Sequence, residues 1–465
     1  MGGTNLHTMN RRHLRVALLA ALVLSVSVVA YGAATAERSG TAADVPTAPP
    51  RENVTVATES ARYGTIMAWH PNGSRLYYDD ARTKYFDVDR VPGTMTVEYA
   101  ATDTIHTAGP TCSSPPCALN VVERANLTTG ETEVVYARYD ASQHAAEWHD
   151  HERVNDTHLL IADMIDDRVV MVDTETELVE WAWQAQAAFP VEGGGPFPED
   201  WAHLNDVDLL PDGRVMASLR NQDQVVFIEP GEGIQENWTL GAEDDHDTLY
   251  EQHNPDYIPA SEGGPAVVVA DSENARIVEY QRENGTWTRT WEWSDSRIQW
   301  PRDADRLPNG NTLVADTHGS RLLEVAPNGS VAWSVPLAHP YDVERFGTGE
   351  DSTGGESAAS LGLTSRTGGS GADGGGGPSL LGGVSDFVKS LAPTWVVNGV
   401  LYVAPVWMGR EQFFAVGLGL AVAVVWPVLE LRWRFPDVGL RLPVYRERRD
   451  AEVRADGDEP AEDAE

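Results

Sequence analysis

The chain has 465 residues, with 71 Asp and Glu against 34 Lys and Arg, so its formal net charge at pH 7 is −37. So large an acidic excess excludes nucleic acid as a partner, because the phosphates would be repelled. Lys84 and Lys389 are the only lysines. An acidic surface almost without lysine is typical of a halophilic, archaeal-like protein, in which molar salt screens the self-repulsion.

The first predicted element is an apolar segment from Leu14 to Ala34, preceded by Arg11, Arg12 and Arg15. Its length suits a membrane-spanning helix, and the basic flank is expected to face the cytoplasm. A cleaved signal peptide is the alternative, because Ala34-Thr35-Ala36 resembles a processing site. Under either interpretation residues 1–36 direct export of the domain after them, and residues 37–54 form a linker.

The stretch from Trp201 to Glu229 reads WAHLNDVDLLPDGRVMASLRNQDQVVFIE. Strand-like runs flank a Pro-Asp-Gly turn and a third run comes after them, which predicts an antiparallel β-meander. Related stretches begin near His149, His253 and Trp300, at intervals of roughly fifty residues, the length of a four-stranded propeller blade. Residues 55–346 are therefore predicted to form one all-β propeller.

The number of blades depends on how the two ends of residues 55–346 are interpreted. The stretch from Ala68, AWHPNGSRLYYDDARTKYFDVD, is interpreted as a degenerate first blade. HPYDVERF, from His339, matches only the first strand of the template. Such a lone strand would close the ring by pairing with another blade and removing an exposed edge. We expect six blades, with five as the alternative.

Cys112 and Cys117 are the only cysteines. In an oxidising compartment they would form a disulfide that closes a small loop and contributes about 2 kcal/mol. Two cysteines without a nearby His pair are too few for a zinc site. We therefore expect no metal, and neither a phosphate-binding loop nor a dinucleotide motif indicates a cofactor.

Beyond the propeller the composition changes three times. Residues 347–383 are rich in Gly and Ser and are predicted to be a flexible tether. Residues 385–408 are apolar and predict an interfacial or membrane-associated segment. Residues 413–431 predict a transmembrane helix, and arginines in the 432–465 tail place that tail in the cytoplasm. The propeller is then expected at the cell membrane, on the extracellular side.

The innermost strands of a propeller line a central channel, and their first residues open at one mouth. Aligned on the turn, four of these strands place one polar residue each at the same position: His149, Asn205, His253 and Arg302. His203 lies two residues before Asn205, on the same strand face. Arg220 comes after the second strand of that blade, where another blade carries Thr317. Convergent Arg, His and Asn side chains are typical of a site for sulfate, phosphate or carboxylate oxygens.

Together, His203-Leu204-Asn205, Arg220, Gln252-His253 and His149-Asp150 resemble the arylsulfate sulfotransferases, here as a haloarchaeal-type, membrane-anchored member. The resemblance covers residues 55–346. It implies a six-bladed propeller that transfers a sulfuryl group from a phenolic sulfate ester to another phenol, without a nucleotide donor, through a sulfohistidine.

The resemblance also implies roles for the matching positions. His253 would be the nucleophile, with His203 and Arg220 completing the catalytic set. His149 and Asn205 would hold sulfuryl oxygens, and Arg302 and Thr317 are further candidates for substrate binding. The chain departs from the bacterial members, which carry an N-terminal β-sandwich and a disulfide near the site that Cys112 and Cys117 do not match in position.

Two other functions remain open from the residues alone. One is a non-catalytic, surface-tethered propeller that binds a protein or glycan. The other is a metal-dependent hydrolase or lactonase propeller, which would need Glu, Asn and Asp around a central cation. Aryl sulfate and phenol are the partners expected under the first interpretation.

Overall fold

The computed structural model describes residues 11–35, 45–60, 64–141, 146–348, 354–367, 393–405 and 407–435. They fall into two compact units, one of residues 36–407 and one made of the segments 1–35 and 408–465. The larger unit holds the strands and the smaller one holds two long helices.

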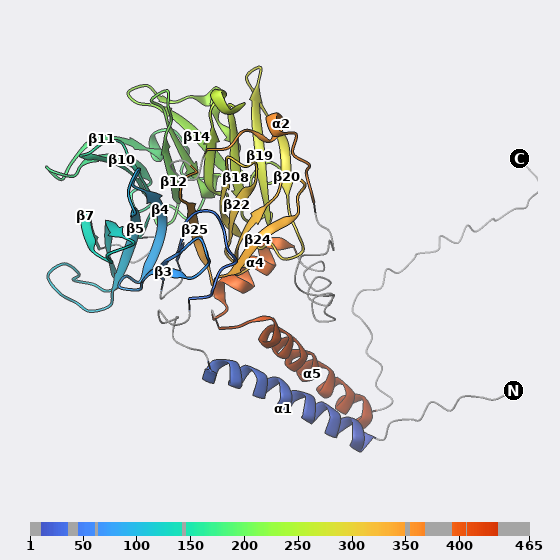
Figure 1. Ribbon diagram of the computed structural model, residues 1–465. Coiled ribbons are helices and arrows are strands. Elements are labelled where there is room, and N and C mark those ends of the chain that lie inside the picture. Colours follow the sequence, from blue (N-terminus) through green and yellow to red (C-terminus); the bar gives the residue numbers. More distant parts are fainter. Residues whose placement is uncertain are drawn as a thin grey trace, which may run out of the picture. The chain divides into compact units, whose positions relative to one another are not determined.

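The strands of the larger unit form six antiparallel sheets, and within each sheet neighbouring strands are hydrogen-bonded in a simple meander. This is a six-bladed β-propeller, so six blades are confirmed over five. Figure 1 shows the blades succeeding one another from blue strands to yellow ones. The first blade contains β1 (Thr55–Glu59), β2 (Ile66–Trp69), β3 (Arg75–Asp79) and, from the end of the domain, β25 (Pro340–Arg345). The second contains β4 (Lys84–Arg90), β5 (Thr96–Ile105), β6 (Cys117–Asn126) and β7 (Thr132–Asp140), and the third β8 (Trp148–Arg153), β9 (His158–Asp163), β10 (Arg168–Asp173) and β11 (Leu178–Gln184).

The fourth blade contains β12 (Leu204–Leu209), β13 (Val215–Leu219), β14 (Gln224–Glu229), β15 (Gly233–Ile234) and β16 (Leu240–Gly241). The fifth contains β17 (His253–Ile258), β18 (Ala266–Asp271), β19 (Arg276–Glu283) and β20 (Thr286–Trp293). The sixth contains β21 (Pro301–Arg306), β22 (Thr312–Asp316), β23 (Arg321–Val325) and β24 (Val331–Pro336).

Ring closure uses the lone strand at the end of the repeats. β25 is the innermost strand of the first blade and pairs antiparallel with β1, with Thr55 opposite Arg345. In Figure 1 the orange β25 accordingly lies beside strands of the blue N-terminal part. The closing strand leaves the innermost edge of the first blade paired, as predicted.

The stretch from Ala68 spans two blades, so its interpretation as one degenerate blade was wrong. β2 and β3 are the outer strands of the first blade, whereas β4 begins the second. The Pro71-Asn72-Gly73 turn resembles the turn that elsewhere joins the first two strands of a blade. Here it joins the two outer strands, because the innermost strand comes from the other end of the domain.

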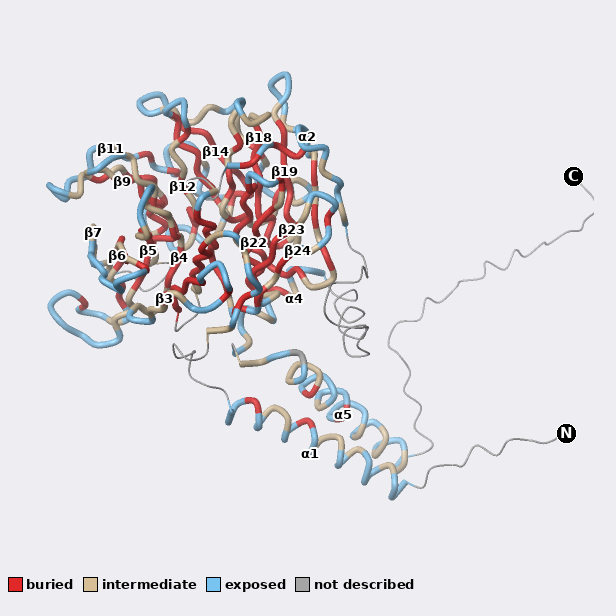
Figure 2. The backbone as a smooth tube through the Cα atoms, in the orientation of Figure 1, coloured by how far each residue is buried: buried red, intermediate tan, exposed pale blue. Residues whose placement is uncertain are grey.

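The core lies between neighbouring blades. One apolar cluster joins Leu160 and Val169 of one blade to Val207 and Val226 of the next, and all four are at most 3% exposed. The outermost strands β7 and β11 are mostly exposed instead, as the pale outer strands in Figure 2 show. Alternating β-branched residues therefore stabilise the ring from the inner three strands of each blade.

Residues 354–367 lie against the propeller rather than forming part of a tether, which corrects the prediction for 347–383 over this stretch. The short helix α2 (Ala358–Leu361) begins after the fully buried Ser357, and the backbone N–H of Ala358 donates to both carboxylate oxygens of Glu279, at 2.7 and 3.0 Å. Arg366 forms a parallel bridge with Trp293. The hydrogen bonds to the buried Glu279 carboxylate hold this segment on the propeller, although the segment has few apolar side chains to bury. The other predicted tether residues, from 349 to 353 and from 368 on, lie outside the described residues.

The apolar segment predicted for 385–408 contains helix α4 (Thr394–Val403) among its described residues. Ten helical residues rise about 15 Å, half of the hydrocarbon thickness of a bilayer. The described helix is thus too short to cross a bilayer by itself, and the interfacial assignment of this segment stays a prediction.

The smaller unit consists of α1 (Arg11–Thr35) and α5 (Arg410–Arg434), which pass the length and composition criteria for membrane spans. They are antiparallel, because Arg15 near the start of α1 pairs with Glu430 near the end of α5 at 2.6 Å. Small residues allow close approach: a Cβ on Gly419 would lie 3.5 Å from the Cβ of Ser25. The predicted cytoplasmic tail lies outside the described residues from residue 436 on.

Candidate active site

Each innermost strand is irregular near its start. The pairing of the innermost strand with its neighbour shifts register there in all six blades, a β-bulge that re-aims one side chain. Every innermost strand also carries an Asp or Glu at one equivalent position, such as Asp256 or Asp305. The residue three positions before this acid lies at the bulge in every blade. These six residues, which we call the mouth residues, are Phe86, His149, Asn205, His253, Arg302 and Tyr341.

The four mouth residues predicted from the alignment do converge. Tyr341 is within ring-contact distance of His149 (centroids 5.7 Å) and His253 (6.4 Å), and the Arg302 guanidinium lies 5.0 Å from its ring centroid. Phe86 stacks on His149 at 4.6 Å. The sequence interpretation missed Tyr341 and Phe86, although KYFDVD and HPYDVE carry the same spacing and would have revealed them.

The turn before the mouth holds residues with left-handed backbone. His203, Glu251, Trp300 and His339 each lie two positions before a mouth residue, and their φ angles lie between 46° and 50°. Non-glycine residues adopt this conformation at a cost of order 1 kcal/mol, and such strain is concentrated at functional sites. The same turn conformation therefore comes before the mouth residue in four successive blades.

His203 and Arg220, seventeen residues apart, form a fixed pair. Arg220 Nη1 lies 3.1 Å from His203 Nε2, and His203 Nδ1 lies 2.6 Å from the Asp200 carboxylate. Guanidinium can only donate, so Nε2 accepts and the proton of the neutral ring is on Nδ1, where it bonds Asp200. Burial and then the Arg220 charge lower the pKa of His203 below its ordinary value, which keeps this arrangement neutral.

His253 is fully buried, and its partners fix its tautomer in the same way. Its Nδ1 lies 2.9 Å from Ser272 Oγ and 3.2 Å from the Glu251 carbonyl oxygen. Ser272 donates its one proton to the Pro301 carbonyl at 2.7 Å, so the hydroxyl accepts from His253. The Nδ1 proton leaves the Nε2 lone pair without a hydrogen-bond partner.

The charges around His253 keep its imidazole neutral. Burial lowers its pKa well below the ordinary value, and Arg302, Arg220 and His203 lower it further. His149 is affected similarly: burial first, then His203 and Arg302, lower its pKa. A neutral imidazole with an unpartnered nitrogen has the chemistry that a nucleophile needs, and the cations around it would attract an anion.

Arg302 is the cation of the mouth without a carboxylate partner. It forms no ion pair with any described residue; it hydrogen-bonds Ser60 Oγ and lies 5.2 Å from the Trp300 ring. Buried guanidinium groups are normally paired, because desolvation of an unpaired charge costs several kcal/mol. The arrangement favours an anionic ligand beside Arg302.

Two predicted binding residues hold the architecture together. Thr317 donates its hydroxyl proton to the Pro340 carbonyl at 2.7 Å, as Ser272 does one blade earlier, so it has no proton left for a substrate. Asn205 donates to the Gln252 carbonyl at 2.8 Å, and its side-chain oxygen has no hydrogen-bond partner. Cys112 and Cys117 are disulfide-bonded between β5 and β6.

A cavity of about 330 Å³ lies beside Arg220 and Glu251, lined also by Tyr250 and by the Gly194–Pro196 segment. Its volume is in the range of small-molecule sites. None of the motifs used in the sequence interpretation indicated Tyr250 or this segment.

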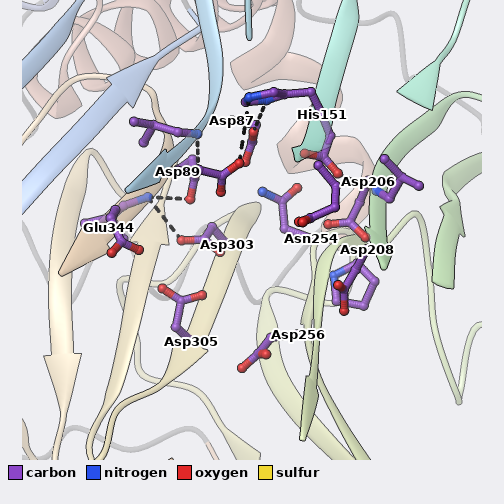
Figure 3. Close-up of a pocket in the computed structure, with 17 residues that line it drawn as sticks. Asp87, Asp89, His151, Asp206, Asp208, Asn254, Asp256, Asp303, Asp305 and Glu344 are labelled. Atoms are coloured by element: carbon purple, nitrogen blue, oxygen red, sulfur yellow. Dashed lines mark hydrogen bonds and ion pairs between the residues drawn. The ribbon is translucent and has the colours of Figure 1, made fainter. Parts of the chain in front are cut away.

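Beneath the mouth, the same strands present acids. A channel cavity of about 50 Å³ is lined by eleven carboxylates, two from each innermost strand except one, where Asn254 replaces the first (Figure 3). The upper carboxylates bond the next blade: Asp342 accepts from the Val88 N–H at 2.7 Å, and Asp303 from Val343 at 3.2 Å. The lower set includes Asp208, Asp256, Asp305 and Glu344, which recur at one position of the sequence repeat and are expected from it to bond the blade backbone rather than to catalyse.

Asp305 does not meet that expectation. It is 6% exposed and has no hydrogen bond or ion pair with another described residue. Burial, and after it repulsion from Asp303 and Asp256, raises its pKa well above the ordinary value. Among the described residues, Asp87, Asp89 and His151 in the channel wall have a spacing that would suit a metal ion. None of these three is a mouth residue, whereas Asp223, Asp244 and His246, which have a similar spacing, line the cavity beside Arg220.

Comparisons with known proteins address both fold and family. No curated protein matches the chain. Similar solved structures include a protein of unknown function from Bacteroides caccae (10% identity, TM-score 0.43, covering 63% of this chain and 97% of that one). Another is the periplasmic gluconolactonase PpgL of Pseudomonas aeruginosa (14%, 0.41, 64% and 99%). Likeness at this level carries no functional argument, and the propeller is established by its own strand pairing.

A family model gives the more specific result. The model described as Arylsulfotransferase (ASST) matches residues 128–338. This range contains His149, His203, Arg220, His253 and Arg302, the residues that carry the mouth chemistry. Over residues 128–338 the chain is therefore similar to the arylsulfotransferase (ASST) family.

Proposed function

We propose that the protein transfers a sulfuryl group from an aryl sulfate ester to a phenol through a sulfohistidine on His253. The observation that carries the proposal is the unpartnered Nε2 lone pair of His253, held beside the uncompensated cation of Arg302. The family match over residues 128–338 supports this reaction class.

In the first half-reaction, His253 Nε2 attacks the sulfur atom in line with the phenolic oxygen. The N–S bond forms as the S–O bond to the aryl group breaks, and the phenolate leaves and takes up a proton. Ser272 and the Glu251 carbonyl hold the Nδ1 proton and orient the ring. In the second half-reaction, the oxygen of an acceptor phenol attacks sulfur, its proton is released and the Nε2 lone pair is regenerated.

The cations stabilise the transferring group. Arg302 and the His203–Arg220 pair are donors fixed before substrate arrives, and charge on the sulfuryl oxygens rises in the transition state. Preorganised donors of this kind lower the barrier without the reorganisation that water would require. The cavity beside Arg220 is the place for the aryl ring.

The mouth chemistry also supports this reaction over its alternatives. A metal-dependent hydrolase needs free carboxylates next to the reacting group. The described carboxylates of the innermost strands lie in the channel (Figure 3), and two beside the mouth are already paired: Asp200 lies 2.6 Å from His203 and Glu251 lies 3.7 Å from Arg220. A scaffold propeller would have no need to leave a half-buried guanidinium without a carboxylate partner. Transfer of an anionic group accounts for both features.

The helices supply the location. Antiparallel α1 and α5 place Arg11, Arg12 and Arg15 at the same end as Arg432 and Arg434. By the positive-inside rule this end is cytoplasmic, so the propeller, attached at the other end of both helices, is outside the cell. Packing of α1 against α5 favours a retained anchor over a cleaved signal.

The test is the first half-reaction with 4-nitrophenyl sulfate and no acceptor. The wild-type protein should release a burst of nitrophenol equal to the enzyme present and retain sulfate label. His253→Ala should abolish both, since no neighbour replaces a covalent nucleophile, while the nearby His318→Ala should keep both. Label that persists in His253→Ala and vanishes in His149→Ala or His203→Ala would refute the assignment.

A further inference from the structure

Helix α4 packs on the propeller through its most polar residue. Asn398 is fully buried; its amide donates to Glu273 Oε2 at 2.7 Å, and its oxygen accepts from Gln299 Nε2. Glu273 comes directly after Ser272, the hydroxyl that bonds His253. Gln299 lies three residues before Arg302, so α4 connects the two turns that hold the proposed nucleophile and the unpaired cation.

The helix also borders the mouth itself. Trp300 is in ring contact with Tyr402 of α4 (centroids 5.8 Å) and with His253 (6.4 Å). The Glu273 N–H donates to the Tyr250 carbonyl at 3.1 Å, and Tyr250 lines the cavity beside Arg220. A surface that contacts the outer side of α4 would therefore lie near the mouth residues and near the cavity beside Arg220.

That outer side has the opposite polarity from the surface of a soluble protein. Four of the large residues of α4 are 49–78% exposed: Trp395, Val400, Tyr402 and Val403. A surface helix in water buries its apolar face and exposes its polar one. Here the amide is buried and Val400 and Val403 face away from it. Trp395 and Tyr402, three residues before Asn398 and four after it, flank the buried amide and are still exposed. An exposed apolar surface of this kind suits contact with an apolar medium.

The chain itself brings a bilayer within reach. Six residues, Ala404 to Gly409, separate the end of α4 from the start of α5, the C-terminal candidate span. Fully extended, this connection reaches only about 25 Å. The covalent chain alone therefore keeps the end of α4 within about 25 Å of the start of α5.

We propose that the outer face of α4 docks on the lipid bilayer and that the phenolic acceptor is an amphiphile which enters the site from the membrane. The acceptor class rests on the proposed sulfuryl transfer, whereas the docking rests only on α4 and its tether. An acceptor of this class carries the phenol on an apolar chain or ring system, with the hydroxyl at the membrane surface.

The docking is tested without activity, in full-length protein reconstituted into phosphatidylcholine–phosphatidylglycerol vesicles. Because Cys112 and Cys117 are disulfide-bonded, Val403→Cys provides a single thiol for an environment-sensitive fluorophore. We expect quenching by brominated lipid at position 403 and none at Glu232→Cys, a matched exposed position on the β14–β15 turn. Quenching by aqueous iodide alone at position 403, or cross-linking between two copies there, would refute the docking.

The acceptor class is tested in the same vesicles by comparing 4-dodecylphenol with phenol, using 4-nitrophenyl sulfate as donor. An insertion of about twenty Gly and Ser residues between Met408 and Gly409 frees the mouth from the span. The insertion should lower kcat/KM for 4-dodecylphenol by roughly ten- to a hundredfold, through loss of effective concentration, and leave phenol unchanged.

The outcomes separate the two proposals. If phenol is sulfated but the insertion leaves 4-dodecylphenol unaffected, the membrane route is wrong and sulfuryl transfer stands. If neither phenol is sulfated by the wild-type protein, the proposed function fails and the acceptor class with it, whatever the fluorophore at position 403 reports.

Discussion

The mouth and the channel of this propeller are built from the same six strands and have opposite chemistry. The mouth residues are aromatic, imidazole, amide and guanidinium groups, whereas one and three residues further along the strands all but one of the positions carry Asp or Glu. Three residues of strand correspond to about 10 Å. Over that distance the surroundings change from a site that favours an anion to one that repels it.

The difference lies in how each set of charges is compensated. In the channel, upper carboxylates bond backbone N–H groups of the next blade, as Asp342 does with Val88, and so join the blades. At the mouth, Arg302 has no carboxylate partner among the described residues and His253 keeps a free nitrogen. The carboxylates that accept hydrogen bonds in the channel stabilise the ring. The unpaired guanidinium at the mouth is instead available to bind an anionic ligand.

The largest effect is expected on removal of the mouth cation. Arg302→Met keeps the length of the side chain and removes its charge, so kcat/KM for an aryl sulfate should fall roughly a hundred- to a thousandfold, as for loss of one preorganised donor. The exposed Arg289→Met is the matched control and should be within twofold of wild type. Steady-state kinetics decide, and a loss of less than threefold would show that the mouth is not an anion site.

A smaller effect concerns pH. Burial first, and then the charges of Arg302 and Arg220, hold the pKa of His253 well below 6.5, its ordinary value. Because a lowered pKa preserves the neutral nucleophile in acid, the burst rate should stay level as pH falls through 6.5 and decline only below it. Arg302→Met removes a charge that lowers this pKa, so its acid limb should move to higher pH. A wild-type limb centred at or above pH 6.5 would contradict the assigned environment.

The smallest effect on activity is expected in the channel. The raised pKa of Asp305 means that the folded state binds this proton more tightly than the unfolded state. Stability from this group is present at low pH and is lost as pH rises above the ordinary carboxyl range. Asp305→Asn removes the repulsion, so at pH 7 Tm should rise by about 2–4 °C, for roughly 1 kcal/mol, with kcat/KM nearly unchanged.

Calorimetry of Asp305→Asn beside the exposed Glu232→Gln provides the control for a general charge effect. A fall in Tm at neutral pH for Asp305→Asn alone would mean that its carboxylate is stabilising, and the contrast between mouth and channel would need another explanation.

Local patterns in the sequence were sufficient for the blades. Period-two runs around Pro-Asp-Gly specify strands and turns because these depend on neighbours in the chain; Gly213 supplies the positive φ, 89°, that this turn requires. The repeat then aligned His149, Asn205, His253 and Arg302, because equivalent positions in equivalent blades must converge on one axis. Extending the same alignment would have added Phe86 and Tyr341.

The sequence by itself therefore determined the propeller, its mouth and the two candidate spans. Only the tertiary structure decided how each charge is compensated: that Ser272 fixes the tautomer of His253, that Arg302 lacks a carboxylate and that Thr317 bonds Pro340. It also placed α4 on Glu273, 125 residues away. Periodicity reports which face of an element is apolar, but the partner of a polar atom depends on which distant segments meet, and short motifs carry no record of that.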